Sequence, residues 1–281
     1  MGSTMTDQIE SPTVRKVYHR LIPLLFLMLF FNYLDRSNIG FAELDMGDKL
    51  RLGPSIFGFA GSIFFLGYMV LEVPSNLLLH RFGARRWIGR ILLTWGAVAA
   101  LTAFVYDDTS FCVMRFLLGV MEAGFLPGIA VYVTKWFPER YRARAVGGYI
   151  IGNSIAAVLG GPSSTALMKY LDRFASLAGW QWMFIVAGAA AMILGLVAFR
   201  AMAERPADVK WLTAEQKAWL ESALESEREA LGGQRHVPVL RVIRDSRVWS
   251  LSILFGCALV GIYGLLLAGR FEPLSFGHQR C

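Results

Sequence analysis

The chain consists of long apolar runs separated by short polar segments. An α-helix rises about 1.5 Å per residue, so about 20 consecutive apolar residues cross the hydrocarbon core of a bilayer. The first run contains Asn-Tyr-Leu-Asp-Arg at 32–36 and no small-residue cleavage pattern, which favours a retained span over a signal peptide. The pattern predicts an all-α membrane protein with six spans and a further seventh transmembrane helix. The runs lie near residues 17–41, 54–80, 86–106, 109–136, 144–168, 180–200 and 247–268.

The composition supports the membrane class. Hydrophobic residues make up 55% and charged residues 17% of the 281 residues, whereas soluble domains carry about 25% charged residues. The mean hydropathy is +0.47. The net charge is +7, but the basic residues lie between the apolar runs and do not form one continuous face. Such a distribution argues against nucleic acid as a partner and leaves the lipid bilayer as the expected one.

The residues that commonly bind metals or act as nucleophiles show no useful pattern. The three cysteines and four histidines have no metal-ligand or redox spacing. No serine or cysteine has a suitably placed base along the sequence. We therefore expect no metal, no cofactor and no enzymatic activity.

The distribution of lysine and arginine predicts the orientation. Twenty of them lie in, or within five residues of, the N-terminal tail and the segments that follow the second, fourth and sixth runs. Loops rich in these residues remain in the cytoplasm. The sequence therefore predicts a cytoplasmic N-terminal tail over residues 1–16 and a multi-pass protein of the cell (inner) membrane. The opposite loops contain only Lys49, Arg51, Lys169 and Arg173.

Residues 201–246 differ from the apolar runs, because charges of both signs are dense there. This composition predicts a cytoplasmic linker. Thr213 and Gln216 have the spacing of a capping box, and Gly232 is a stop signal. We expect a helix over about 213–231 within the linker.

Ionisable side chains lie inside three of the predicted spans. A charge near the middle of a spanning helix costs about 2.5–3.5 kcal/mol on insertion scales. Several such charges are therefore expected to face a polar interior and not the lipid. They are Asp35, Arg36, Glu72, Arg115 and Glu122.

Arg115 and Glu122 are separated by two helical turns, so they share one face of their helix about 10 Å apart. Gly119 lies between them, and we expect room for a ligand or water beside the backbone at this glycine. Arg36, in the first span, is at a similar depth to Arg115. Guanidinium groups bind carboxylates through two donors and stay charged, so Arg36 and Arg115 are candidate substrate-binding residues for a small organic anion.

Asp35 and Glu122 are candidate proton-coupling residues. Burial favours the neutral form of a carboxyl group and a nearby arginine favours the ionised form, so such a group can change its protonation state. The alternative is that the four charges form static salt bridges that fix helix packing, such as Asp35–Arg115 and Arg36–Glu122. Both interpretations place the four side chains in the interior.

Two further residues are weaker candidates. Asn153 lies beside a row of small residues in the fifth run, and we expect it to reach the substrate cavity. Glu72 lies two residues before Pro74 and could equally extend to the membrane surface or satisfy a helix kink. The row itself predicts close helix packing and consists of Gly148, Gly152, Ala156 and Gly160.

Three segments carry long, ordered sequence motifs. They are FNYLDRSNIG at 31–40, RFLLGVMEAGFLPG at 115–128 and WFPERYRAR at 136–144. These motifs resemble the anion:cation symporter family of the major facilitator superfamily. The segment RFGARR at 81–86 resembles the loop motif of that superfamily between the second and third spans, with His80 where an aspartate is usual.

The resemblance implies an N-terminal six-helix bundle of the major facilitator fold, followed here by a seventh transmembrane helix. It implies proton-coupled symport of a small organic anion, such as a carboxylate or sugar acid, by alternating access. By position in the motifs, Asp35 and Glu122 correspond to protonatable carboxylates, and Arg36 and Arg115 to substrate-binding or conformational arginines. Residues of the cytoplasmic gate would be Arg81, Gly83, Arg85 and Arg86.

The resemblance ends near residue 267, whereas members of the family continue to twelve spans. Residues 269–281 have an unrelated polar composition. We therefore expect a product truncated after the seventh span, for which a missing C-terminal half or a second copy is a candidate partner. The alternative function is a membrane protein that binds or senses an organic anion without transporting it.

Overall fold

The computed structural model describes residues 2–230, 245–250, 253–254 and 257. Each regular element in these residues is helical, which confirms the predicted all-α class. The long helices are α1 (Gly2–Leu50), α2 (Pro54–Phe82), α3 (Ala84–Leu101), α4 (Asp108–Glu122), α5 (Phe125–Thr134), α6 (Glu139–Tyr170), α7 (Gly179–Ala201) and α8 (Ala214–Ala230). Short 3₁₀ helices are η1 (Thr102–Phe104), η2 (Phe174–Ser176) and η3 (Pro206–Asp208).

Within the described residues, six helical segments are long and apolar enough to cross a membrane. They correspond to the six predicted runs of residues 17–200 and mostly extend beyond the predicted ends. The predicted seventh span and the tail at 269–281 lie largely outside the described residues. The six segments are Ile9–Glu43, Ser55–Phe82, Ala84–Phe104, Asp108–Thr134, Glu139–Tyr170 and Gly179–Ala201.

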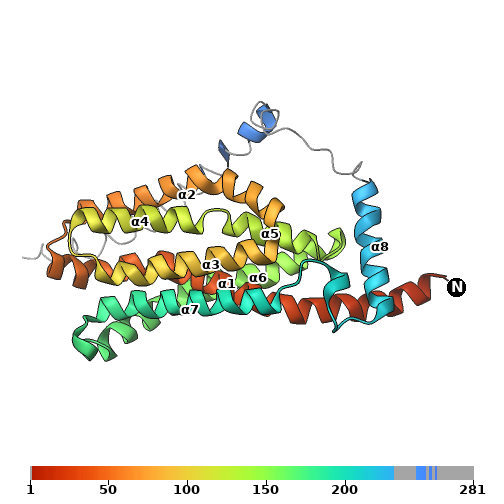
Figure 1. Cartoon of the computed structure of the whole chain (residues 1–281), viewed down its shortest axis with the longest axis horizontal. Coiled ribbons are helices and arrows are strands. Elements are labelled where there is room, and N and C mark those ends of the chain that lie inside the picture. Colours follow the sequence, from red (N-terminus) through yellow and green to blue (C-terminus); the bar gives the residue numbers. More distant parts are fainter. Residues whose placement is uncertain (1, 231–244, 251–252, 255–256, 258–281) are drawn as a thin grey trace, which may run out of the picture. The chain divides into compact units, whose positions relative to one another are not determined.

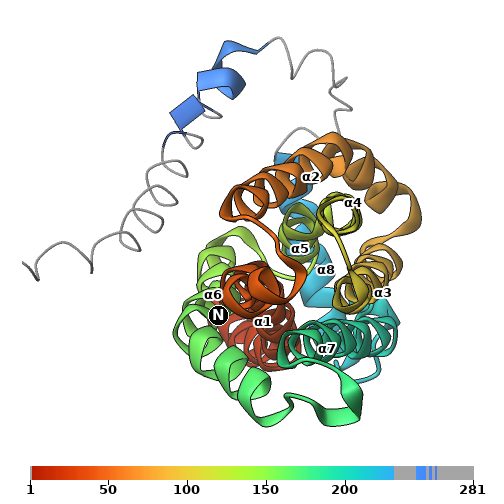
Figure 2. The ribbon, with the colours of Figure 1, turned by 90° about the vertical axis from the view of Figure 1, so that its left-hand side faces the viewer.

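The chain divides into two compact units, residues 1–227 and residues 228–281. In the first unit, the six candidate spans run side by side (Figure 1), and a view along them shows how they surround a common interior (Figure 2). The most extensive helix contacts join α3 to α7, α2 to α4 and α1 to α6. In the second unit, residues 246–250 are helical and Arg247 N donates to Asp245 Oδ1 at 2.9 Å, as at a helix N-cap.

Glycines allow the paired helices to approach closely. A Cβ atom placed on Gly188 of α7 would lie 2.6 Å from the Ala100 amide nitrogen of α3, and one on Gly96 of α3 would lie 2.8 Å from the Met192 amide nitrogen of α7. On α6, a Cβ atom at Gly152 would lie 2.7 Å from the Phe26 carbonyl oxygen of α1. The small-residue row of α6 therefore packs against α1, as the sequence predicted.

The fourth span is broken, unlike the single continuous span predicted at 109–136. Helix α4 ends at Glu122, and Gly124 adopts a φ of 82° before α5 begins. The break leaves buried backbone groups without helical partners, and α2 supplies a partner for one of them, because Ser75 Oγ donates to the Ala123 carbonyl oxygen at 2.6 Å. Trp87 Nε1 of α3 in turn donates to Ser75 Oγ at 3.0 Å. The break is thus fixed by a hydrogen-bonded chain from three helices.

Local capping sets the start of two helices. At the start of α4, Ser110 N donates to Asp107 Oδ1 at 2.7 Å, and Asp107 N donates to Ser110 Oγ at 3.1 Å. The hydrogen bonds from Ser110 hold the pKa of the Asp107 carboxyl below its usual value. At the start of α8, Gln216 N donates to Thr213 Oγ1 and Thr213 N donates to Gln216 Oε1, both at 3.2 Å. These reciprocal bonds satisfy amides that a helix leaves without internal partners.

The spans differ in how much apolar surface they bury. In the most apolar part of α2 only 22% of the residues are buried, and in α6 only 28%, whereas the span formed by α4 and α5 reaches 56%. Met69 of α2 and Val158 of α6 are among the most exposed apolar side chains. Helix α4 is therefore central in the first unit, and α2 and α6 present apolar faces.

We predict that Gly188→Ala destabilises the protein by about 1–3 kcal/mol, because the added methyl group would overpack the α3–α7 contact. Gly61→Ala is the matched control, since nothing lies within 4 Å of a Cβ atom there. Thermal unfolding in detergent should show a lower Tm for Gly188→Ala only. Equal Tm values for the two variants would mean that the close α3–α7 contact does not limit stability.

Candidate functional site

Glu122 accepts three hydrogen bonds at a single buried oxygen. Asn32 Nδ2 donates to Glu122 Oε1 at 2.6 Å, and Arg36 donates to the same oxygen from Nε at 2.8 Å and from Nη2 at 2.5 Å. The Glu122 side chain is fully buried, and that of Arg36 is 23% exposed. Asn32 and Arg36 lie on α1, so this cluster joins α1 to α4. Charge-assisted bonds of this kind offset the cost of burying the carboxylate.

Asp35 and Arg115 lie in the same interior with different partners. Trp95 Nε1 of α3 donates to Asp35 Oδ2 at 3.0 Å. Arg115 is only 3% exposed, and its Cζ atom lies 5.0 Å from the centroid of the Phe64 ring. The Cζ atom of Arg36 lies 5.5 Å from the same centroid. Both predicted substrate-binding arginines therefore face one aromatic ring of α2, where cation–π attraction stabilises their charge.

Several polar atoms in this interior have no hydrogen-bond partner among the described residues. Two are carboxylate acceptors, Asp35 Oδ1 and Glu122 Oε2. Two are guanidinium donors, Nε and Nη1 of Arg115. Buried polar groups in proteins are normally paired, so each unpaired one calls for an explanation, such as a bound water, an ion or a functional role. The cluster thus offers unused acceptors on its acids and unused donors on one arginine.

The static pairing considered from the sequence is present only in part. Arg36 and Glu122 do form an ion pair. Within the part of the chain that the structure describes, Asp35 and Arg115 form no hydrogen bond or ion pair with each other. The interior is therefore not a set of two closed salt bridges.

Gly119 does not provide the space for a ligand that the sequence suggested. A Cβ atom there would lie 2.9 Å from the Phe64 carbonyl carbon and 3.0 Å from the Tyr68 amide nitrogen. The backbone of α2 fills this position, so Gly119 serves the close α2–α4 contact. The expectation was wrong because it considered α4 without its neighbour.

The structure adds Asn32 and three aromatic residues to the candidate site, and it shows no hydrogen bond between Asn153 and the described residues of the charged cluster. Asn32 precedes Asp35 and Arg36 by three and four positions, so their shared helix face could have identified it. Phe64, Tyr68 and Trp95 had no sequence signal beyond being aromatic. Asn153 lies on α6; its Oδ1 is buried, and it has no hydrogen bond to any described residue. Its predicted substrate contact remains a prediction.

The predicted gate residues surround the turn between α2 and α3. Gly83 has a φ of 87°, and a Cβ atom there would lie 2.6 Å from Glu204 Oε1. The Glu204 carboxylate accepts from Ala84 N at 3.1 Å and from Arg85 N at 2.7 Å, and thereby caps α3. Arg85 Nε donates to the Phe199 carbonyl oxygen of α7 at 2.6 Å.

Glu204 was not identified from the sequence, because it precedes α8 in a charged linker with no motif around it. It also lies 3.9 Å from Lys135 Nζ, after the end of α5. His80, Arg81 and Arg86 are exposed. The turn between α2 and α3 is therefore attached to the end of α7 by Arg85 and, through Glu204, to Lys135 after the end of α5.

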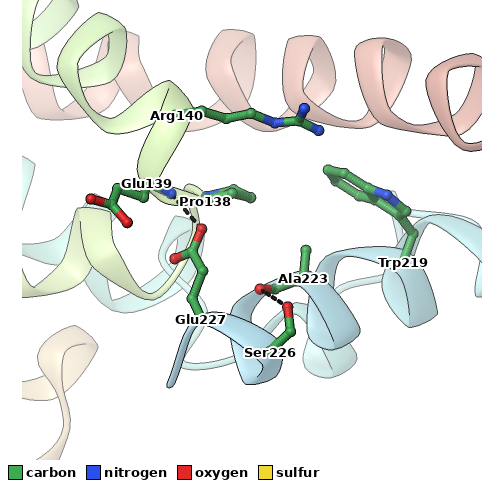
Figure 3. Close-up of a pocket in the computed structure, with 7 residues that line it drawn as sticks. All are labelled: Pro138, Glu139, Arg140, Trp219, Ala223, Ser226 and Glu227. Atoms are coloured by element: carbon green, nitrogen blue, oxygen red, sulfur yellow. Dashed lines mark hydrogen bonds between the residues drawn. The ribbon is translucent and has the colours of Figure 1, made fainter. Parts of the chain in front are cut away.

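The segment 136–144 is held by two acids from distant parts of the chain. Glu10 of α1 pairs with Arg140 and accepts from Tyr141 Oη at 2.5 Å. Glu227 of α8 pairs with Arg142 at 2.7 Å and accepts from Glu139 N at 2.6 Å. Figure 3 shows the Glu227 carboxylate beside the first turn of α6.

One hollow of about 530 Å³ lies between α8 and the first turn of α6, and its wall includes Arg140, Trp219 and Glu227 (Figure 3). A second hollow of about 230 Å³ lies between α1, α6 and α7 and includes Leu34 and Met183. Neither contains Asp35, Arg36, Arg115 or Glu122. The charged cluster thus lies outside both of these hollows.

Comparison with known proteins gives a consistent assignment. The sequence profile of the Major Facilitator Superfamily matches residues 25–273. A protein of Agrobacterium vitis, named as a proposed tartrate transporter, is 43% identical over 93% of this chain and 58% of its own length. A "Quinolone resistance transporter" of Acinetobacter baumannii is 40% identical over 92% of this chain and 59% of its own length. This chain therefore spans about three fifths of the length of these relatives.

A solved structure shares the fold. The xylose transporter XylE of E. coli, in a partially occluded inward open conformation, aligns with 90% of this chain and 61% of its own at a TM-score of 0.55. The identity is 15%, so this likeness concerns the fold alone. The predicted six-helix bundle of the major facilitator type is thereby confirmed for the described spans.

We predict that Glu204→Ala speeds amide hydrogen exchange in the first turn of α3, because Ala84 N and Arg85 N lose their acceptor. A loss of about 0.5–2 kcal/mol in local stability is expected for a removed helix cap. Asp208→Ala is the control, since Asp208 is exposed in the same linker and its side chain has no hydrogen bond to a described residue. Exchange measured by mass spectrometry that is equal in both variants would contradict the capping role.

Proposed function

Because the chain belongs to the major facilitator superfamily, we propose that it takes part in proton-coupled symport of a small organic anion. The observation that carries this proposal is the composition of the buried cluster. It combines two guanidinium groups on one ring with two carboxyl groups that each keep an unpaired oxygen. Unpaired guanidinium donors can bind an anion, and unpaired carboxylate oxygens can accept protons.

Arg115 is the proposed primary anion-binding residue. Its Nε and Nη1 donors have no partner among the described residues, and its charge stays in place because guanidinium is not deprotonated in proteins. A substrate carboxylate supplies two acceptors in the geometry that these donors require. Arg36 is the second proposed contact. To bind the substrate, it would give up at least one of its hydrogen bonds to Glu122 and donate to the substrate carboxylate instead.

Glu122 is the proposed residue that couples protons to this exchange. While it is ionised, it holds both Nε and Nη2 of Arg36. A proton on Glu122 would weaken that ion pair and make Arg36 available to an anion. Asp35, anchored through Trp95, is the second proposed protonatable group. One proton and one anion would thus enter the interior together, which limits the net charge buried there.

The proposed transport cycle uses the break after Glu122. Alternating access requires one bundle to rock against another around a site near the midplane. The α4–α5 break, held by Ser75, joins Glu122 to helix α2 and so to the turn that bears Arg81, Gly83, Arg85 and Arg86. We propose that this turn forms a cytoplasmic gate, in a protein of the inner membrane whose N-terminus is cytoplasmic.

The described residues form one six-helix bundle, and the matched relatives are longer. We propose that a second half or a second copy completes the carrier. A second candidate function is anion binding or sensing without transport. It is favoured by the fact that the whole cluster is built from residues 32–122 of this chain.

We predict that Glu122→Gln loses proton-driven accumulation of L-tartrate in proteoliposomes but retains tartrate exchange at equal pH. Glutamine keeps an acceptor for Arg36 but cannot release a proton. Glu215→Gln, on the exposed side of α8, is the control and should transport like the wild type. Equal loss of accumulation and exchange would assign Glu122 a purely structural role.

We predict that Arg115→Ala weakens L-tartrate binding about 10- to 100-fold, which corresponds to the loss of charged hydrogen bonds worth about 1.5–3 kcal/mol. Calorimetry on the detergent-solubilised chain measures this. Arg173→Ala is the control, since that side chain is 94% exposed. Binding without any flux would favour the sensing function, and preferential binding of a fluoroquinolone would contradict the organic-anion assignment.

A further inference from the structure

Helix α2 carries a third acid that the proposed mechanism does not use. Phe64, Tyr68 and Glu72 are spaced by four residues, so they lie along one face of α2. The Cζ atom of Arg36 lies 5.5 Å from the Phe64 ring centroid and 5.3 Å from the Tyr68 ring centroid. Glu72 follows one helical turn beyond Tyr68, about 6 Å further along the axis. Arg36 therefore lies over the helix face that leads to Glu72.

The environment of Glu72 differs from that of Glu122. Glu72 is half-buried, and its carboxylate makes no hydrogen bond or ion pair with any described residue. The guanidinium of Arg36 lies over the ring of Tyr68, one helical turn before Glu72. The main chain of Glu72 is fixed, because Asn76 Nδ2 donates to the Glu72 carbonyl oxygen at 2.9 Å. The Glu72 carboxylate is thus available to a partner from outside its own helix.

The neighbouring helices place further charged groups around Arg36. Helix α1 contributes Asp35, the residue before Arg36, and α4 contributes Glu122, which binds Arg36, and Arg115, which lies over the same Phe64 ring. Arg90 of α3 instead stacks on Trp87, with 4.1 Å between its Cζ atom and the ring centroid. Arg36 is therefore bonded to one acid, Glu122 on α4, and lies over the face of α2 that bears a second acid, Glu72.

We propose that Glu72 is a second acceptor for Arg36, to which the guanidinium turns when Glu122 takes up a proton. The inference rests on the proposed function. The proton comes from solvent and is bound by Glu122, whose ion pair with Arg36 then weakens. Until an anion binds, Arg36 keeps its charge and has the carboxylate of Glu72 as its partner, so no unpaired cation remains inside. When Glu122 releases the proton, Arg36 returns to it.

The exchange has a direction. Glu72 lies nearer than Tyr68 to the C-terminal end of α2, which Gly83 and the gate turn follow. Arg36 would therefore move toward the gate turn when it exchanges Glu122 for Glu72. Because Arg36 is partly exposed and has a long side chain, it can move along this face while Phe64 and Tyr68 continue to contact it. Glu72 is a positioning residue in this scheme, since it acts through Arg36.

The test is a pH titration of the protein in detergent, followed by infrared difference spectroscopy of buried carboxyl groups. The band that Glu122→Gln removes identifies Glu122. In Glu72→Gln, Arg36 has lost its alternative partner and holds the ionised Glu122 more firmly. We expect the midpoint of Glu122 protonation to move about one unit toward lower pH, a tenfold change in its proton affinity.

Glu72→Asp is the second variant. It keeps an acid at this position, so its midpoint of Glu122 protonation should lie closer to that of the wild type than to that of Glu72→Gln. Glu139→Gln controls for the loss of a remote carboxyl group. An unchanged midpoint in Glu72→Gln would overturn the inference. So would a shift in Glu72→Asp as large as that in Glu72→Gln, or the absence of any Glu122 titration. L-Tartrate binding and uptake by the wild type are measured separately, so their absence would refute the proposed function while the titration still decides the role of Glu72.

Discussion

The ion pair between Arg36 and Glu122 is the interaction around which the interior is organised. It places a fully buried carboxylate and a guanidinium between α1 and α4, where removal of either partner would leave an uncompensated charge. Asn32 adds a third donor to the same oxygen, and the ring of Phe64 supports both arginines. These contacts require α2 and α4 to be very close, which the glycine at position 119 permits. Packing and electrostatics therefore depend on each other at this point.

The same helices connect the interior to the turn between α2 and α3. The α4–α5 break directly follows Glu122 and is bound by Ser75, which also accepts a hydrogen bond from Trp87. At the turn, Glu204 binds the first amides of α3 and lies near Lys135 after α5. Glu10 and Glu227 hold the start of α6 in a comparable way. Acids outside the recognised motifs thus attach the helix ends to one another.

Much of the fold and part of the site could be predicted from the sequence. Spanning helices follow from uninterrupted apolar runs, because the bilayer requires a minimum length and internal backbone hydrogen bonds. The four charges could be recognised because ionised groups in a span are costly. Asn32 could have been added from its spacing to Asp35 and Arg36. Trp95, Phe64 and Tyr68 could not, since aromatic residues are common in membrane spans and no spacing distinguished these three.

The sequence by itself determined which segments are long and apolar enough to span the membrane, that Asp35, Arg115 and Glu122 are buried, and where the recognised motifs lie, because these properties depend on local composition and spacing. Only the tertiary structure decided the pairing. It matched Arg36 with Glu122 and Asp35 with Trp95, and it filled the space beside Gly119 with the backbone of α2. Pairing depends on the rotation and separation of helices that are distant in sequence. Those quantities are set by close glycine contacts across the whole bundle, and no single segment contains them.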